Sequence, residues 1–278
     1  MTINCKGNLI DLSTPKVMGI LNITPDSFYD GGKYKNEHDI LLQVEKMLQG
    51  GATFVDVGAY SSRPGAENIP EDEELKKSVE VTRLILKHFP DCIISVDTFR
   101  SKVAKENIEA GAALVNDISA GDMDNKMMET VAKFQVPYII MHMKGIPETM
   151  QKNINYKDVV KEIIYYFSKK IADANKLKIN DLIIDPGFGF GKTLDNNYEI
   201  LNKLELFKMP ELPILVGASR KSMIYKLLNI NPNDALNGTT SINTIALLKG
   251  ANILRVHDVK EAMECVKIFN QLNSYHNN

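Results

Sequence analysis

The chain has 278 residues, 44% of them hydrophobic, and is therefore long enough to bury a substantial core. Its 33 Lys and Arg residues nearly balance its 35 Asp and Glu residues, which gives a formal net charge of -2 without any long run of one sign. Nucleic acid and anionic membrane surfaces are therefore not its natural partners.

The cysteines and the first residues of the chain indicate a cytoplasmic protein. Cys5, Cys92 and Cys265 are scattered and match no metal-ligand spacing, as expected of ordinary buried thiols in a reducing compartment. Met1 leads into polar residues rather than a signal sequence. No apolar run approaches the ~20 residues that a membrane span needs.

Short apolar runs, mostly β-branched or aliphatic and without polar alternation, predict eight parallel strands that are covered on both faces. They are residues 17–21, 53–57, 93–96, 113–115, 136–141, 182–184, 214–216 and 253–256. Segments between them carry apolar residues at helical spacing, as at Ile40, Val44 and Met47, and predict amphipathic helices. No Pro-, Gly- or Ser-rich linker divides the chain, so we expect one domain over residues 1–278.

Eight strand-then-helix units in a chain of this length predict an α/β fold, a (β/α)8 TIM barrel, rather than an open doubly wound sheet. The placement of polar residues supports the barrel, because nearly every strand carries some at its carboxyl end. They are Asn22, Asp56, Asp97, Asn116, Asp117, His142, Asp185, Ser219, Arg220, Lys221, Arg255 and His257. In a barrel these strand ends converge on one mouth, where such enzymes carry their chemistry.

Four of these residues offer acceptors and donors that can read the edge of a polar heterocycle. They are Asp97, Asn116, Asp185 and Lys221. A carboxylate that accepts two N–H bonds gives strong, oriented recognition. Each residue alone could equally cap a helix, because strand-to-helix turns favour Asp and Asn, but the group together weakens that alternative.

A second group is cationic and suits a phosphate or pyrophosphate. It comprises Arg63, Arg220, Lys221, Arg255 and His257. Arg255 and His257 are two residues apart, so in an extended strand end they project from the same face. A lone surface arginine is usually only solvated and binds no ligand. The strand-end position favours a ligand-binding role for Arg255, and favours it less for Arg220.

The segment DPGFGFGKT, residues 185–193, has neither the GxGxxG nor the P-loop spacing. It predicts a turn that lets the backbone approach a ligand, with Phe188 or Phe190 either stacking on a flat group or filling the core. No GxSxG or HExxH motif is present, and His142 could be an ordinary core histidine. A Mg2+ ion held by ligand phosphate oxygens and the Asn22 amide is compatible with this residue set.

Several segments carry a specific resemblance. They are, in chain order, MGILNITPDSFYDGG, DVGAYSSRPGA, SVDTF, NDIS, MHM, DPGFGFGK, GASRKS and RVHDV. From about Val17 to the last predicted helix, the chain closely resembles the bacterial dihydropteroate synthases, the folate-pathway family inhibited by sulfonamides. The resemblance implies a (β/α)8 barrel, usually a homodimer, whose small-molecule substrates are 6-hydroxymethyl-7,8-dihydropterin pyrophosphate and 4-aminobenzoate and whose products are 7,8-dihydropteroate and pyrophosphate.

The resemblance also implies a role for each matching residue. The pterin would be held by Asp97, Asn116, Asp185 and Lys221, with Met141 and Phe190 as walls. The pyrophosphate would be bound by Ser62, Arg63, Arg255 and His257, with Asn22 as the ligand of its Mg2+. The aminobenzoate pocket would be shaped by Phe28, Arg63, Pro64, Lys221 and Ser222. Catalysis would rest on positioning and electrostatic stabilisation by Asp30, Arg63, Asp97, Asp185 and Lys221.

The chain departs from the family pattern where GGESTRPG is usual and GAYSSRPG stands here. Tyr60 thus replaces a Glu, Ser62 replaces a Thr, and Tyr29 stands where a Ser is usual. Residues 26–32 are expected to form a closing flap that carries Phe28 and Asp30. A methyltetrahydrofolate-linked methyltransferase module would not need TPDSF, SRPGA and SRKS together, and a non-catalytic pterin-binding protein could lack Asn22, Arg255 or His257.

Overall fold

The computed structural model describes residues 1–23, 37–60, 69–147, 149–152 and 154–275. All eight predicted strands are present within two residues of their expected bounds. They are β3 (Lys16–Asn22), β4 (Phe54–Gly58), β5 (Ile93–Asp97), β6 (Leu114–Asp117), β7 (Tyr138–Met141), β8 (Leu182–Asp185), β9 (Leu215–Val216) and β10 (Ile253–Val256). They pair in parallel in the order β8-β7-β6-β5-β4-β3-β10-β9. A further parallel bridge between Ile184 and Ile214 joins the two ends of this order, which confirms the predicted barrel.

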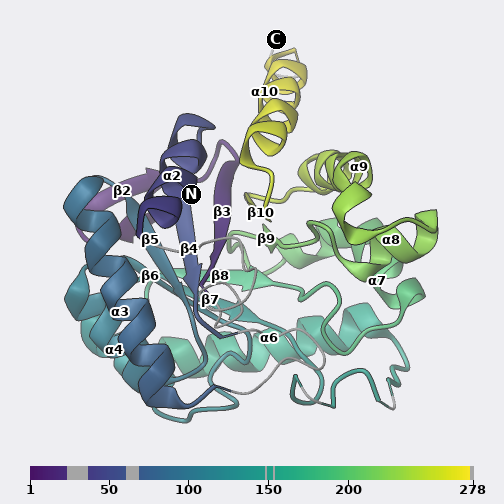
Figure 1. Cartoon of the computed structure of the whole chain (residues 1–278). Coiled ribbons are helices and arrows are strands. Elements are labelled where there is room, and N and C mark those ends of the chain that lie inside the picture. The colour runs from purple at the N-terminus through teal and green to yellow at the C-terminus, as the bar shows by residue number, and fades with distance from the viewer. Residues whose placement is uncertain (24–36, 61–68, 148, 153, 276–278) are drawn as a thin grey trace.

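Helices lie outside the strands, with α3 and α4 side by side on one flank and α8 and α9 on the other (Figure 1). The α-helices of the described residues are α2 (Glu37–Gln49), α3 (Glu71–His88), α4 (Ser101–Ala110), α5 (Met127–Phe134), α6 (Val159–Lys176), α7 (Leu194–Asn202), α8 (Ser222–Leu228), α9 (Leu236–Leu248) and α10 (Val259–Ser274). Short 3-10 helices are η1 (Leu204–Lys208) and η2 (Pro232–Asp234). Within the described ranges, no helix is long and apolar enough to cross a membrane.

The continuous apolar runs of the strands follow from burial on both faces. Val55 and Val57 of β4 point outward and share a core with Val44 and Met47 of α2, while Phe54 belongs to a separate cluster inside the barrel. The alternation of side chains along a strand explains this division. It also places every second residue of each strand end inside the mouth, where a polar side chain can meet its neighbours.

An amino-terminal hairpin was not among the predicted elements. Its strands are β1 (Thr2–Cys5) and β2 (Asn8–Asp11), joined by Lys6 and Gly7, which both have positive φ angles. Ile3 and Cys5 pack into the same cluster as Phe54, which closes the amino-terminal end of the barrel. The opposite, carboxyl end is therefore the end that can admit a ligand.

Candidate active site

Arg255 connects three strand ends at the barrel mouth. Its Nε donates to Asp56 Oδ2 and its Nη2 to Asp97 Oδ2, each at 2.6 Å. Asn116 Nδ2 donates to the same Asp56 oxygen at 2.9 Å. The structure thus brings together Arg255 of β10, Asp97 of β5 and Asn116 of β6, three of the predicted site residues, around Asp56 of β4.

Asp56 is fully buried, and its Oδ1 makes no hydrogen bond with any described residue. The Arg255 side chain keeps 17% exposure, and its described bonds use only Nε and Nη2. Nη1 therefore remains available to a ligand that enters the mouth. Burial raises the pKa of Asp97 to about 7, although Arg255 beside it acts in the opposite direction.

Asp185 and Lys221 form the second part of the site. Asp185 Oδ1 accepts a hydrogen bond from Gly187 N at 2.7 Å, and Lys221 Nζ donates to Phe188 O at 2.6 Å. Burial lowers the pKa of Lys221 to about 8, opposed by the Asp185 carboxylate. Burial likewise raises the pKa of Asp185, opposed first by Lys221.

Gly217 lies between the two parts. A Cβ placed on it would lie 3.8 Å from Arg255 Cβ and 3.9 Å from Asp185 Oδ2, so these two side chains face each other across this glycine. The absence of a side chain there leaves the space between them open. Asp97, Asn116, Asp185, Lys221 and Arg255 therefore border one site, as their strand-end positions predicted.

The structure separates the two phenylalanines of the DPGFGFGKT segment. Phe188 is completely buried in the core between strands and helices. Phe190 is half-buried, lies 4.6 Å from Lys221 Nζ by its ring centroid, and shares an apolar cluster with Met141. Phe190 and Met141 are therefore placed to border a ligand, whereas Phe188 fills the core.

Two other rim residues serve the fold. Arg220 donates from Nε and Nη2 to the two oxygens of Asp258, each at 2.8 Å, and from Nη1 to Asn233 O, so it ties the rim to α10. Asp117 accepts from Ser119 N, from Gly121 N and from the Tyr138 hydroxyl, as a turn-capping carboxylate does. The contacts of Arg220 agree with the expectation that a phosphate-binding role is less favoured for Arg220 than for Arg255.

The two histidines of the rim differ in surroundings. The His257 ring is half-buried, and its Nδ1 lies 3.0 Å from Ser219 Oγ, which also accepts from His257 N. His142 is buried against Tyr166 with ring centroids 4.9 Å apart, and its Nδ1 has no hydrogen-bond partner among described residues. Burial lowers the pKa of His142 to about 2, so it is a neutral core histidine.

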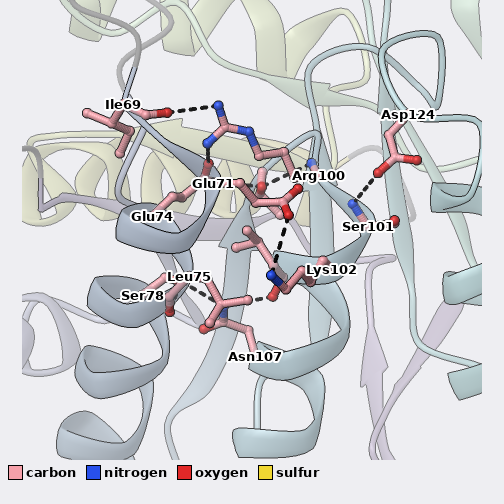
Figure 2. A network of polar contacts seen from close by, with 12 residues as sticks. Ile69, Glu71, Glu74, Leu75, Ser78, Arg100, Ser101, Lys102, Asn107 and Asp124 are labelled. Carbon is pink, nitrogen blue, oxygen red and sulfur yellow. Dashed lines mark hydrogen bonds and ion pairs between the residues drawn. The ribbon is translucent and has the colours of Figure 1, made fainter.

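A network of polar contacts centred on Arg100, which was not predicted, flanks residues 61–68 (Figure 2). Arg100 donates from Nη2 to Ile69 O at 2.9 Å, forms an ion pair with Glu74, and its guanidinium carbon lies 5.5 Å from the Tyr60 ring centroid. Glu74 also accepts from the Thr98 hydroxyl at 2.6 Å. In the sequence, this network is indicated by an acidic residue, Glu74, at one of the helically spaced buried positions of α3.

Other predicted residues are distributed as follows. Asn22 ends β3, is half-buried, and makes no side-chain hydrogen bond with a described residue. Ser222 begins α8 directly after Lys221. The remaining predicted residues, Phe28, Asp30, Ser62, Arg63 and Pro64, together with Tyr29 and the predicted flap at 26–32, lie outside the described residues. Within the described ranges, no group of three or more His, Cys, Asp or Glu residues could hold a metal ion.

Comparisons with known proteins identify relatives that match nearly the full length of the chain. Residues 18–257 match the pterin binding enzyme family. The chain is 43% identical over 270 residues to the dihydropteroate synthase of Escherichia coli (strain K12), covering 96% of this chain and 95% of that protein.

Two solved structures are similar in fold and sequence. The Yersinia pestis dihydropteroate synthase in a sulfonamide drug complex superposes with a TM-score of 0.93 at 43% identity, covering 99% of this chain and 100% of that chain. The Xanthomonas albilineans dihydropteroate synthase in complex with 7,8-dihydropteroate gives a TM-score of 0.87 at 31% identity, covering 98% and 99% of the two chains.

Proposed function

The chain belongs to the dihydropteroate synthase family of pterin-binding enzymes, and from this we propose how its residues divide the work of the reaction. It is a transferase that condenses 6-hydroxymethyl-7,8-dihydropterin pyrophosphate with 4-aminobenzoate to give 7,8-dihydropteroate and pyrophosphate. The observation that supports our assignment of roles is the convergence of Asp97, Asn116, Asp185, Lys221 and Arg255 at the carboxyl mouth of the barrel.

The pterin ring lies among the carboxylates in this proposal. Asp97 and Asp185 accept N–H bonds from the amidine-like edge of the heterocycle, while Asn116 and Lys221 supply donors to its acceptors. Because these groups are buried or half-buried, little water competes for their hydrogen bonds to the ring. These bonds then fix the orientation of the ring. Met141 and Phe190, which share an apolar cluster, cover the ring from the side.

The pyrophosphate lies toward the cationic side of the mouth. We assign its oxygens to Arg255 Nη1, to His257, and to Ser62 and Arg63. Asn22 is a suitable Mg2+ ligand, because it is the last residue of β3 and its side-chain amide makes no hydrogen bond with any described residue. Magnesium typically takes few protein ligands, so one amide oxygen is enough beside the phosphate oxygens. A bound Mg2+ would supply positive charge that lowers the cost of releasing pyrophosphate.

The reaction needs positioning more than a base or a nucleophile. The bond between the pterin methylene carbon and the pyrophosphate oxygen breaks with its electron pair on oxygen, and the arylamine nitrogen then bonds to the methylene carbon and releases a proton. Cationic groups stabilise the departing oxygens, and the electron-rich ring and Asp30 stabilise the positive carbon. Phe28, Arg63, Pro64, Lys221 and Ser222 hold the aminobenzoate against this carbon.

The test uses the purified protein with Mg2+ and both substrates. Dihydropteroate should form, and a folded sample that gives no product would overturn the assignment. Asp185→Asn should weaken binding of the pterin pyrophosphate by about 100-fold, because a charge-assisted hydrogen bond is lost. Cys92→Ala, which changes a buried side chain in the core between strands and helices directly before β5, should leave this affinity unchanged. Equal effects of both substitutions would mean that the ring is bound elsewhere.

We further propose that the 278 residues form one domain, that the protein is cytoplasmic, and that it is a homodimer. Three buried free cysteines support a reducing compartment. The homodimer is supported by apolar side chains that α8, α9 and α10 expose on neighbouring helices: Leu227, Leu228, Ile245, Leu248, Ile268 and Leu272. Exposed apolar patches of this kind are typical of contact surfaces.

A further inference from the structure

Lys192 is a lysine in the protein interior, with 3% exposure, although lysine is almost never fully buried. Its Nζ donates to His142 O at 3.0 Å, to Gly187 O at 2.9 Å and to Phe190 O at 2.9 Å. An ammonium group has three N–H donors, so these bonds use all of them. Lys192 therefore has no donor left for a substrate, and its described contacts are with the backbone alone.

The three carbonyls belong to the two segments that carry much of the site. His142 follows Met141 at the end of β7, and Gly187 and Phe190 lie in the turn after Asp185 at the end of β8. The turn approaches β7 closely, since a Cβ on Gly187, whose φ is +71°, would lie 2.1 Å from His142 O. Only glycine allows this approach, and the approach lets one ammonium hold both segments.

The charge of Lys192 has a partner at longer range. Within the described ranges, no carboxylate forms an ion pair with its Nζ, and burial lowers its pKa well below the usual value, opposed by the Asp185 carboxylate. Asp185 is itself 5% exposed, and Lys192 is one of the groups that oppose the rise of its pKa. Each buried charge therefore offsets part of the cost of burying the other.

We propose that Lys192 is a positioning residue of the heterocycle site, whose ammonium fixes the turn that carries Asp185 and Phe190 and keeps the Asp185 carboxylate charged. This inference rests on the proposed function of Asp185. This positioning role explains why the turn needs a lysine rather than an apolar side chain of the same length. A methionine could fill the volume, but it would leave three inward carbonyls without donors.

The first experiment compares Lys192→Met with Lys203→Met, which removes an exposed lysine that pairs with Glu199 on α7. Calorimetric titration with the pterin pyrophosphate and Mg2+ should give a Kd that rises at least tenfold for Lys192→Met and stays unchanged for Lys203→Met. The KM for aminobenzoate should change less than twofold in both variants. An unchanged Kd in a folded Lys192→Met protein would overturn the proposal.

The pH dependence of this binding separates charge from shape when it is measured in an Asp97→Asn background, which removes the titration of Asp97 from the profile. Asp185 faces Lys221 at the start of α8, Arg255 of β10, and the ammonium of Lys192, while His142 of β7 is neutral. Loss of one of three cations raises the pKa of Asp185, so binding by its carboxylate should need a higher pH in Lys192→Met. Lys192→Arg, which keeps the charge, should restore the midpoint that this background shows with Lys192. A midpoint that does not move in Lys192→Met would overturn the claim that Lys192 keeps the Asp185 carboxylate charged.

A second experiment needs no substrate and therefore does not depend on the proposed function. Thermal unfolding is measured for Lys192→Met, Asp185→Asn and the double variant. If the two charges offset each other, Asp185→Asn should lower Tm less in Lys192→Met than it does in the wild type. Losses of Tm that simply add would overturn the coupling. A wild-type protein that binds no pterin would instead refute the proposed function and leave this result intact.

Discussion

The two carboxylates that hold Arg255 are not equivalent, because only Asp97 keeps part of its side chain open to the mouth while Asp56 is fully buried. Burial raises the pKa of Asp97 to about 7 in the free enzyme, opposed by Arg255. The heterocycle needs the carboxylate form as an acceptor of N–H bonds. We therefore expect pterin pyrophosphate binding to weaken as pH falls below about 7, approaching tenfold per pH unit.

Asp97→Asn tests this role directly. At pH values above the pKa of Asp97, the variant should bind the pterin pyrophosphate about 100-fold more weakly, since a neutral amide replaces a charge-assisted acceptor. It should also lose the step in binding that lies near pH 7. Calorimetric Kd values across pH measure both effects, with Asp91→Asn at an exposed position as the control. A step that persists in Asp97→Asn would assign the titration to another group.

His142 should make folding stability depend on pH. Its pKa falls from the ordinary 6.5 to about 2 through burial, so the unfolded chain binds a proton that the folded protein does not. Stability from this group is complete above pH 6.5 and is lost as pH falls below it, by up to about 1.4 kcal/mol per pH unit.

Urea unfolding measures this dependence. Below pH 6.5, His142→Phe should show a shallower fall of the unfolding free energy with decreasing pH than the wild type, because the phenyl ring takes no proton and still fits against Tyr166. His88→Phe, at the exposed end of α3, serves as the control. Identical slopes in wild type and His142→Phe would show that other groups carry the acid sensitivity.

Strand-end residues could be predicted from the sequence, and their partners could not. Asp97, Asn116, Asp185, Lys221 and Arg255 stand at or just after the carboxyl ends of apolar runs, and these ends must converge in a barrel, so chain order alone places them at one mouth. The choice between Phe188 and Phe190 depends on how glycines with positive φ turn the backbone after β8. That geometry has no periodic signal in the sequence, and the same holds for the three carbonyls around Lys192.

At the scale of elements, the Arg100 network connects the end of β4 to the start of α3. Arg100 contacts Tyr60 and Ile69, the residues on either side of the segment 61–68 that carries Ser62 and Arg63. Tyr60 stands where the family usually has a Glu, and here its ring packs edge-on against Phe99 at a centroid distance of 5.0 Å. Ring packing therefore takes the place of a carboxylate at this point in the chain.

We expect Arg100→Lys to lower kcat/KM by about tenfold, since Lys keeps the charge beside Glu74 but lacks the fork that reaches Ile69 O as well. A pterin without pyrophosphate should bind as in wild type, because Asn116 and Asp185 are untouched. Steady-state kinetics measure the first effect and calorimetry the second. Lys102→Met, an exposed neighbour on α4 that pairs with Asp72, is the control. Full activity in Arg100→Lys would show that this network serves stability alone.

The amino-terminal hairpin shows why an element of regular structure escaped prediction. Its strands have four residues each, too few for an alternation of buried and exposed residues to stand out. Ile3 and Cys5 are buried only because the barrel offers an open end beneath Phe54. The eight barrel strands, in contrast, carry their own signal, because burial on both faces makes each of them apolar throughout.

At the scale of the whole molecule, helices α8, α9 and α10 leave apolar side chains without a described partner. Ile245 and Leu248 are 40% and 56% exposed on one face of α9, and Ile268 and Leu272 are 69% and 48% exposed on one face of α10. Burying a leucine or isoleucine stabilises an assembly by roughly 1.5–3 kcal/mol. A second copy that covers this surface would supply that burial.

The double variant Leu248→Glu/Ile268→Glu should therefore separate the proposed homodimer, because each glutamate would have to lose its hydration in the interface. Light scattering after size-exclusion chromatography should give twice the 31.1 kDa chain mass for the wild type and the single mass for the variant. Leu9→Glu, at a position 72% exposed on the hairpin at the other end of the chain, should stay dimeric. A wild type with the mass of one chain would refute the homodimer. A double variant that keeps twice the chain mass would place the contact surface elsewhere.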